Sequence, residues 1–349
     1  MLKVVILAGG RGERFWPLSR RRRPKPFLAL GARDSLLRET VRRARSIAPS
    51  RAIRVVTGSS LCAAVRRELR GLGTSPVLVE PAARNTGPAA LLAAREIAAG
   101  DPRAEILTLP SDHRVTGLRE FRAAVATARG LARRGFLVTF GITPDGPNPD
   151  YGYVVRGGRL GASAHRVERF VEKPRPEAAR RLMSREGAVW NSGMFVWRAG
   201  VFLEEASRCE PSFRRWLEIA GAAKRISPAA RRAFQDLPSI PVDRAVLERS
   251  RRVAVVTGRF RWSDLGTWSS LDPILRRGAD GNVSWGELAS LDSRNNLAVH
   301  PGGLTVLSGV EDLLVVGAGD VTLVCRRSHA GKMREILRHL EKGGYGGYL

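Results

Sequence analysis

The sequence predicts an α/β fold with a doubly wound, mostly parallel sheet and a smaller C-terminal β region. Over residues 1–270, apolar strand-like runs alternate with helix-like runs, as in proteins whose parallel sheet carries helices on both faces. From about residue 271 the pattern changes to short strands separated by Gly, Asn and Asp turns. The chain has 349 residues, 43% of them hydrophobic, which is enough for one large core and a smaller one. We therefore expect domains at residues 1–270 and 271–349.

The individual elements follow from this alternation. The expected strands are VVIL at 4–7, IRVVTG at 53–58, PVLVE at 76–80, EILTLP at 105–110 and FLVTFGI at 136–142. The expected helices are residues 35–47, 61–69, 87–99, 118–133, 175–185, 204–218 and 332–342. Asn85 or Thr86 is a suitable cap for the helix at 87–99, because both side chains can accept a backbone N–H bond. The glycine-rich ending GGYGGYL is expected to be flexible.

The most informative stretch is residues 4–28, where an apolar strand runs into a glycine-rich loop. Gly9, Gly10 and Gly12 leave little side-chain bulk, so backbone N–H groups can approach phosphate oxygens closely. Arg14 adds a charged fork for those oxygens, and Lys25 follows. The spacing fits neither G-x-G-x-x-G nor G-x-x-x-x-G-K-[ST], which argues against a dinucleotide fingerprint and a Walker A loop. Taken alone, the loop is either a phosphate site of another nucleotide fold or a tight glycine turn.

The stretch GGRGERFWPLSR resembles the signature of the sugar-phosphate nucleotidyltransferases, and among them the mannose-1-phosphate guanylyltransferases, or GDP-mannose pyrophosphorylases. Further segments resemble elements of this family in the same order along the chain. They are EPAARNT at 80–86, LPSDH at 109–113, YGY at 151–153, FVEKP at 170–174, WNSGMF at 190–195 and WSDLGTW at 262–268. One departure is Pro26, which stands where the family usually has Gln beside the signature lysine, Lys25. Because the matches are collinear over positions 4–268, chance agreement is a poor explanation.

The resemblance implies an enzyme that transfers GMP from GTP to α-D-mannose 1-phosphate, giving GDP-mannose and pyrophosphate. The sugar phosphate would attack the α-phosphorus in line with the help of Mg²⁺, and no covalent enzyme intermediate would form. Thymidylyl- and uridylyltransferases share the loop and both aspartates, so glucose 1-phosphate with dTTP or UTP is the alternative pair. The implied fold is a Rossmann-like nucleotidyltransferase sheet in the catalytic domain, residues 1–270. Residues 271–349 would have left-handed β-helix character and end in a helix.

The resemblance also assigns roles to individual residues. The implied nucleotide-binding residues are Leu7, Ala8, Gly9, Gly10, Gly12, Arg14, Lys25, Glu80, Arg84, Asn85, Thr86 and Asp112. The implied sugar-phosphate-binding residues are Gly152, Glu172, Lys173 and Asn191, and the implied Mg²⁺ ligands are Asp112 and Asp264. Arg14, Lys25 and Lys173 would be catalytic, because they neutralise charge on the triphosphate and on the attacking phosphate.

The chemistry of two of these segments can be weighed from the residues themselves. Asp112 follows an apolar strand, and ligands of open α/β sheets collect at the carboxyl ends of strands. A hard carboxylate there suits Mg²⁺, although a lone Asp after a strand is more often a turn former. Glu172 can bond sugar hydroxyls while Lys173 meets a phosphate, and the alternative is a surface ion pair. His113 is not expected to act as a general base, since the attacking phosphate is already an anion.

The charge of the chain suggests a rival class, a nucleic-acid-binding protein. The formal net charge is +26, but only six of the 59 basic residues are Lys and the 53 Arg are spread along the whole chain. No helix-turn-helix, RNA-binding aromatic signature or zinc-finger spacing accompanies them. We therefore interpret the charge as a compositional bias towards Arg and expect no specific nucleic-acid partner.

The remaining expectations concern compartment and assembly. No segment has the roughly 20 consecutive apolar residues of a membrane span, and the N-terminus lacks a signal-peptide pattern, so we expect a cytoplasmic protein without a membrane partner. Cys62, Cys209 and Cys325 are far apart and are expected to be buried thiols, not a disulfide framework or a zinc site. A homodimer is expected from the family resemblance alone.

Overall fold

The chain divides into two compact units, which we call the first unit and the second unit. The computed structural model describes residues 1–10, 12–184, 187–223 and 225–349, so Arg11 of the glycine-rich loop lies outside the described residues. The first unit comprises Met1–Gly9, Thr40–Ser111 and Val115–Trp262. The second unit comprises Gly10–Glu39, Asp112–Arg114 and Ser263–Leu349. The domain boundary expected near residue 270 stays a prediction.

A mixed sheet forms the centre of the first unit. Its strand order is β3-β2-β1-β4-β9-β6-β10-β8-β7. The strands are β1 (Leu2–Leu7), β2 (Ile53–Gly58), β3 (Leu78–Glu80), β4 (Glu105–Pro110), β6 (Leu137–Ile142), β7 (Gly152–Gly161), β8 (Ala164–Val171), β9 (Ala188–Arg198) and β10 (Val253–Thr257). Strands β3, β2, β1 and β4 are parallel, as are β6 and β10, whereas β9, β7 and β8 pair antiparallel with their neighbours. The five expected strands are all present, and the α/β prediction is confirmed.

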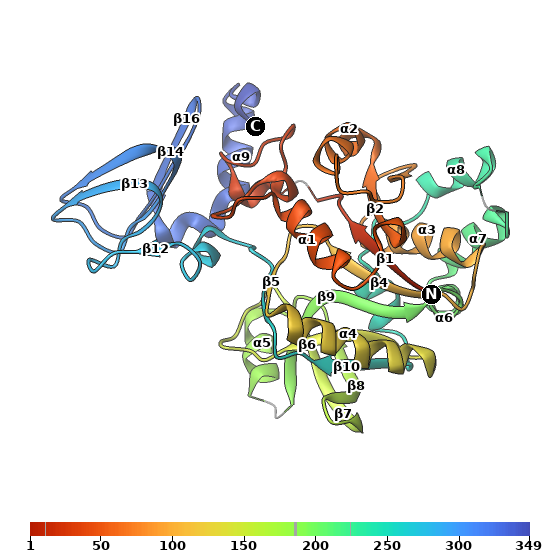
Figure 1. Cartoon of the computed structure of the whole chain (residues 1–349). Coiled ribbons are helices and arrows are strands. Elements are labelled where there is room, and N and C mark those ends of the chain that lie inside the picture. The colour runs from red at the N-terminus through yellow and green to blue at the C-terminus, as the bar shows by residue number, and fades with distance from the viewer. Residues whose placement is uncertain (11, 185–186, 224) are drawn as a thin grey trace. The chain divides into compact units, whose positions relative to one another are not determined.

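Helices cover this sheet. They are α1 (Leu36–Arg45), α2 (Ser59–Glu68), α3 (Thr86–Ala98), α4 (Leu118–Arg133), α5 (Pro176–Met183), α6 (Ala199–Cys209), α7 (Pro211–Ala220) and α8 (Pro228–Gln235), with a π-helix, η4 (Asp243–Leu247). In Figure 1, α4 runs along β6 and β10, and α3, α6 and α7 lie together beside the N-terminal strands. Their apolar faces, including Phe202, Phe213 and Trp216, form the main core.

Two helix expectations need correction or restriction. The single helix expected at 204–218 is wrong, because α6 ends at Cys209 and α7 begins at Pro211. Proline has no N–H and fits only the first turn of a helix, and Glu210 caps the new helix by accepting a bond from the Ser212 N–H. The helix expected at 175–185 is observed as α5, and Arg185 lies outside the described residues.

The second unit contains a β-helix-like sheet and a terminal helix. Its strands are β12 (Arg276–Arg277), β13 (Val283–Leu291), β14 (Leu297–Ser308), β15 (Leu313–Ala318) and β16 (Val321–Arg326), paired in that order. Strand β14 is parallel to both β13 and β15, while the outer pairs are antiparallel. The 3-10 segment η6 (Arg327–Lys332) leads into α9 (Met333–Lys342), which stands beside the sheet in Figure 1. The expected C-terminal β region and helix are confirmed.

Short segments near the glycine-rich loop complete the second unit. They are η1 (Glu13–Phe15), η2 (Lys25–Phe27), η5 (Trp268–Leu271) and η7 (Gly346–Tyr348). Strands β5 (Arg114–Thr116) and β11 (Arg261–Ser263) form a separate two-stranded sheet. Phe15 packs on Trp268 with 4.9 Å between ring centroids, and both side chains are fully buried in the core of the second unit. The ending, expected to be flexible, instead takes a defined conformation: the Trp16 Nε1–H donates to the Tyr348 carbonyl at 2.8 Å.

The cysteine expectation holds only in part. All three cysteines are free, but only Cys209 is buried, while Cys62 and Cys325 are partly exposed. In the described part of the chain, no helix is both long enough and apolar enough to cross a membrane.

Candidate active site

The turn of the glycine-rich loop is built around Gly12. Its φ of +65° is left-handed, and a Cβ there would lie 2.2 Å from the Lys25 Cβ and 2.6 Å from the Lys25 nitrogen. No larger residue fits this position without moving the backbone of η2. The loop therefore packs directly against the segment that carries Lys25.

Lys25 connects two distant acidic segments. Its ammonium donates to Asp112 Oδ2 at 2.9 Å and to the backbone carbonyl of Asp264 at 2.5 Å. The side chain is only 7% exposed, so these bonds are shielded from water. Arg14 reaches the same segment, where its Nη1 donates to the Gly266 carbonyl at 3.5 Å. The predicted residues Arg14, Lys25, Asp112 and Asp264 thus converge within the second unit.

The two aspartates present oxygens that suit a divalent cation. Burial alone would raise the pKa of Asp112, but Lys25 and His113 outweigh this effect and hold the pKa below its usual value. Asp264 Oδ1 accepts the Gly266 N–H at 2.9 Å, which orients the carboxylate. Among the described residues there is no cluster of three or more His, Cys, Asp or Glu side chains arranged to hold a metal. Two carboxylates completed by substrate phosphates are a donor set that fits Mg²⁺.

The segment from Glu80 to Thr86 belongs to the first unit. Asn85 has φ +70° and caps α3, since its Oδ1 accepts the Thr86 N–H at 2.8 Å. The Thr86 hydroxyl accepts the Val242 N–H at 3.0 Å, and Arg84 donates to the Gln235 carbonyl. The cap prediction is confirmed for Asn85. The side chains of Arg84 and Thr86 therefore also have structural partners.

Glu80 ends β3 close to the start of the loop. It is 6% exposed, and a Cβ on Gly9 would lie 3.7 Å from its Oε1. Burial raises the pKa of Glu80 to about 7. A carboxyl group that titrates near neutrality beside a phosphate-type loop is a candidate binding group.

Leu7 and Ala8 use their backbone groups inside the sheet. The Ala8 N–H donates to Val56, the Ala8 carbonyl accepts the Thr57 hydroxyl, and the Leu7 carbonyl accepts the Ser111 N–H. Ala8 therefore has no backbone donor left for a phosphate. The predicted backbone contacts of the loop would start at Gly9.

Gly152, Glu172 and Asn191 meet at one point of the first unit. A Cβ on Gly152 would lie 2.5 Å from Glu172 Oε2 and 3.2 Å from the Asn191 Cβ, so glycine is needed for the other two to approach. Strands β7 and β9 pair Gly152 directly with Asn191. Lys173 Nζ lies 3.2 Å from Glu172 Oε1, with the lysine side chain 56% exposed and the glutamate 10% exposed. The four predicted sugar-phosphate residues therefore form one cluster.

Left-handed backbone conformations occur in several of the segments that carry predicted site residues. Asn85, Lys173 and Leu265, which follows Asp264, are among the non-glycine residues with left-handed φ in the described chain. Such conformations cost about 1–3 kcal/mol each and cluster at binding and catalytic sites. The same conformation occurs elsewhere in the described chain, at Leu30, Asp292, Asn295 and Asp312.

Sequence reasoning missed one member of the cluster, Asp243. Asn191 Nδ2 donates to Asp243 Oδ1 at 2.8 Å, and both residues are buried. Burial, assisted by the nearby charge of Glu172, raises the pKa of Asp243 to about 7. Burial also raises the pKa of Glu172. The sequence does place this acid within the mostly apolar stretch IPVDRAVLE, which is compatible with burial. The stretch alone does not show which residue the carboxylate would contact.

Family comparison agrees with the fold and the loop. Residues 3–277 match the model of the nucleotidyl transferase family. Residues 286–340 match the mannose-P isomerase/GMP-like β-helix domain. The chain therefore belongs to the nucleotidyltransferase family, whose members generally use a divalent metal ion.

Individual relatives narrow the class. The mannose-1-phosphate guanylyltransferase of Escherichia coli K12 is 36% identical over 98% of this chain and 74% of its own length. The xanthan biosynthesis protein XanB of Xanthomonas campestris pv. campestris B100 is 37% identical over 97% of this chain and 73% of its own. A crystal structure from Thermus thermophilus, described as a mannose-1-phosphate geranyltransferase, superposes with a TM-score of 0.88 at 35% identity, covering 97% and 99% of the two chains. Within its family, the chain is an enzyme of the mannose-1-phosphate guanylyltransferase type.

Proposed function

We propose that this enzyme transfers GMP from GTP to α-D-mannose 1-phosphate and releases pyrophosphate and GDP-mannose. The observation that carries the proposal is the convergence of Arg14, Asp112 and Asp264 around Lys25, because it gathers the cations and carboxylates that a metal-bound triphosphate needs. The names of the relatives support the choice of GTP and mannose 1-phosphate.

The chemistry requires positioning and charge neutralisation more than proton transfer. The phosphate of the sugar is already an anion, so its oxygen attacks the α-phosphorus in line and pyrophosphate leaves without a protein base. Arg14 and the shielded ammonium of Lys25 neutralise charge on the triphosphate oxygens. Mg²⁺, held by Asp112 and Asp264, would supply Lewis-acid stabilisation of the same oxygens.

The acceptor would be held by the cluster around Gly152. The buried carboxylate of Glu172 is suited to sugar hydroxyls, and the exposed ammonium of Lys173 is suited to the phosphate. The two ends of one small ligand thus have matching groups side by side. We expect Lys173→Ala to weaken chiefly the use of the sugar phosphate.

Glu80 supports guanine as the base. Guanine presents two adjacent N–H donors on its Watson–Crick edge, and an ionised carboxylate can accept both. Uracil and thymine offer a single N–H on that edge. A buried glutamate next to Gly9 therefore favours GTP over UTP and dTTP.

Pyrophosphate release by the purified enzyme with Mg²⁺ tests the proposal. GTP, ATP, UTP and dTTP are each combined with mannose 1-phosphate and glucose 1-phosphate. Release only with GTP and mannose 1-phosphate is expected. Release with another pair would keep the mechanism and change the substrates, and no release with any pair from folded protein would overturn the proposal.

The metal assignment has its own test within the same assay. Asp112→Asn and Asp264→Asn each remove one negative ligand while keeping the shape of the side chain. We expect Mg²⁺-dependent turnover to fall at least about 100-fold, as for other losses of transition-state charge stabilisation, while both variants still fold, as circular dichroism can check. Full activity in both variants would exclude these ligands.

A further inference from the structure

We propose that Asp243 is a positioning residue that fixes Asn191 as a hydrogen-bond donor towards the sugar. This inference rests on the proposed function, which assigns Asn191 to the sugar subsite. It concerns a residue that neither the sequence motifs nor the family resemblance marks.

The hydrogen bonds of Asn191 determine which way its amide points. Asn191 Oδ1 accepts the Gly193 N–H at 3.2 Å and the Thr139 hydroxyl at 2.6 Å. A backbone N–H can only donate, so the atom facing Gly193 must be the amide oxygen. The nitrogen then faces Asp243 Oδ1 at 2.8 Å, which accepts whether or not the carboxyl group carries a proton on its other oxygen.

This arrangement leaves the amide with one remaining function. Both lone pairs of Oδ1 are engaged, and one of the two Nδ2 hydrogens points at Asp243. Only the second Nδ2 hydrogen remains for a ligand. Asn191 can therefore donate to a sugar oxygen but cannot accept from a sugar hydroxyl, whereas Glu172 beside it can accept. Asn191 and Glu172 thus make different demands on the sugar: one needs a hydrogen-bond acceptor and the other a donor. Epimers place their hydroxyls differently against such a pair, so the pair can select between them.

Asp243 is itself held in place at the start of η4. On the incoming side, the Val242 N–H donates to the Thr86 hydroxyl at 3.0 Å, and the Ile240 carbonyl accepts the Gly87 N–H at 3.0 Å. These bonds tie η4 to the start of α3. Single π-helical turns are rare and are often found at functional sites.

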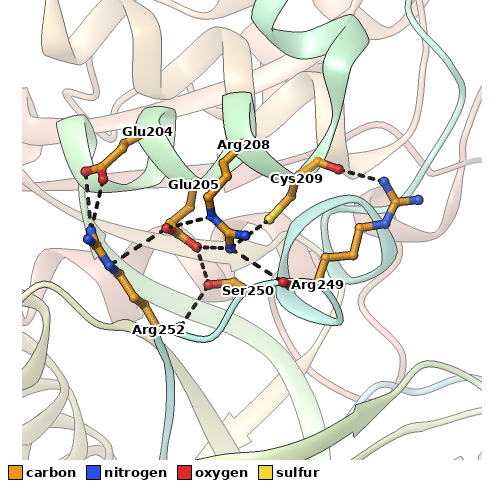
Figure 2. Close-up of polar contacts among 7 residues, drawn as sticks. All are labelled: Glu204, Glu205, Arg208, Cys209, Arg249, Ser250 and Arg252. Carbon is orange, nitrogen blue, oxygen red and sulfur yellow. Dashed lines mark hydrogen bonds and ion pairs between the residues drawn. The ribbon is translucent and has the colours of Figure 1, made fainter.

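A network of charged groups holds the chain on the outgoing side of η4. Figure 2 shows that Arg249, Ser250 and Arg252 bind residues of α6 and its C-terminal end. The Ser250 hydroxyl donates to Glu205 Oε2 at 2.5 Å, and Arg249 Nη1 donates to the Cys209 carbonyl at 2.8 Å. With both ends fixed, the Asp243 carboxylate is a rigid acceptor for Asn191.

The charges around Asp243 are consistent with this role. Glu172 and Lys173 face it from the end of β8, Asn191 faces it from β9, and Arg244 and Glu248 flank Glu172 from η4 and the residue after it. Burial and the repulsion from Glu172 favour the protonated form of one of the two acids. A proton held there lets Glu172 and Asp243 lie close together without removing the acceptor that Asn191 uses.

The test compares Asp243→Leu, which removes the acceptor, with Asp243→Asn, which keeps a carbonyl oxygen in its place. Because one orienting bond is lost, we expect Asp243→Leu to raise KM for the sugar 1-phosphate about tenfold, equivalent to about 1.4 kcal/mol, while KM for GTP changes less than twofold. Asp243→Asn should recover most of the loss. Ser227→Ala, which removes the N-cap bond of α8, serves as a control for lost stability without a change in KM.

A double-mutant cycle distinguishes a positioning role of Asp243 from a purely structural one. If Asp243 acts through Asn191, Asn191→Ala with Asp243→Leu should cost no more than Asn191→Ala alone. A second readout uses sugar 1-phosphates in which one hydroxyl is replaced by fluorine, which can only accept a hydrogen bond, or by hydrogen, which can neither accept nor donate one. At the position that Asn191 contacts, the fluoro analogue should have a lower KM than the deoxy analogue. This preference should disappear in Asp243→Leu.

The outcomes separate the inference from the proposed function. A wild type that releases no pyrophosphate with any substrate pair would overturn the proposed function. A working wild type with an unchanged sugar KM in Asp243→Leu, or with an equal rise in both KM values, would overturn the positioning role. Additive effects in the double mutant would do the same.

Discussion

Gly12 and Gly10 belong to the same loop but are constrained in different ways. A Cβ on Gly12 would collide with Lys25, and its φ is left-handed, whereas a Cβ on Gly10 would meet no atom of the described residues within 4 Å. We predict that Gly12→Ala destabilises the protein by about 1–3 kcal/mol and lowers activity. Gly10→Ala should keep the melting temperature but raise KM for GTP, because the methyl group would face the triphosphate. Thermal unfolding and GTP kinetics check this pair, and equal melting temperatures would contradict the prediction.

The raised pKa of Glu80 predicts how the use of GTP depends on pH. With a pKa of about 7, the carboxyl group ionises as pH rises through neutrality, and only the ionised form accepts both guanine donors. The kcat/KM for GTP should therefore rise with pH through about 7 at saturating sugar phosphate. Glu80→Gln should flatten this rise and reduce the preference for GTP over UTP. A rise of the same size in both proteins would assign the pH dependence to another group.

At the scale of elements, the C-terminal segments brace the glycine-rich loop within the second unit. Trp16, just after η1, donates to Tyr348 of η7, and Arg20 binds both the Ala318 carbonyl and Asp320 in the turn between β15 and β16. Arg21 forms an exposed ion pair with Glu341 of α9 at 2.7 Å. The C-terminal β region and its terminal segments thus hold the chain that follows the loop.

Removing residues 345–349 tests this bracing. The deletion removes the hydrogen bond from the Trp16 N–H to the Tyr348 carbonyl, worth about 0.5–1.5 kcal/mol, and the packing of Leu349 against the core of the second unit, so we expect a lower melting temperature and a higher KM for GTP. KM for the sugar phosphate should stay the same. Arg21→Ala is the matched control, because an exposed ion pair contributes at most about 1 kcal/mol. Equal effects of the two changes on GTP use would argue against bracing through Trp16.

At the scale of the whole molecule, several arginine side chains form ion pairs that stabilise buried glutamates. Glu105 accepts from Arg129 and Arg133, and Glu205 accepts from Arg208, while both acids keep a lowered pKa despite burial. The arginines of these pairs lie on α4 and α6 of the first unit. These pairs agree with the interpretation that the charge of +26 reflects a general use of Arg.

The raised pKa of Asp243 predicts how the stability of the folded protein depends on pH. Asp243 has a folded pKa of about 7 against 3.8 when unfolded, so between these values the folded state holds a proton that the unfolded state has lost. Its contribution therefore makes stability fall as pH rises towards 7. Asp243→Asn lacks this titration and should gain stability relative to the wild type between pH 5 and pH 8. Urea unfolding of both proteins at the two pH values measures the difference, and a constant difference would contradict the raised pKa.

The sequence by itself determined what depends on neighbours along the chain. Alternating apolar runs located the main strands, the helix at 118–133 was predicted to its observed ends, and Asn85 was identified as a possible cap. Collinear motifs identified the family, because each motif is a short run of neighbouring residues that can be recognised without knowing the fold. Pro211 was a local signal as well, and reading it as a helix start would have corrected the helix at 204–218.

Only the tertiary structure decided which distant residues meet. Lys25 binds Asp112 and Asp264 across 87 and 239 positions, and Asp243 reaches Asn191 across 52. No local pattern encodes these contacts, since they depend on strand order and on where η4 is held. Burial likewise raised the pKa of Glu80 and Asp243, because a pKa follows from the solvent and charges around a group, which the linear chain does not specify.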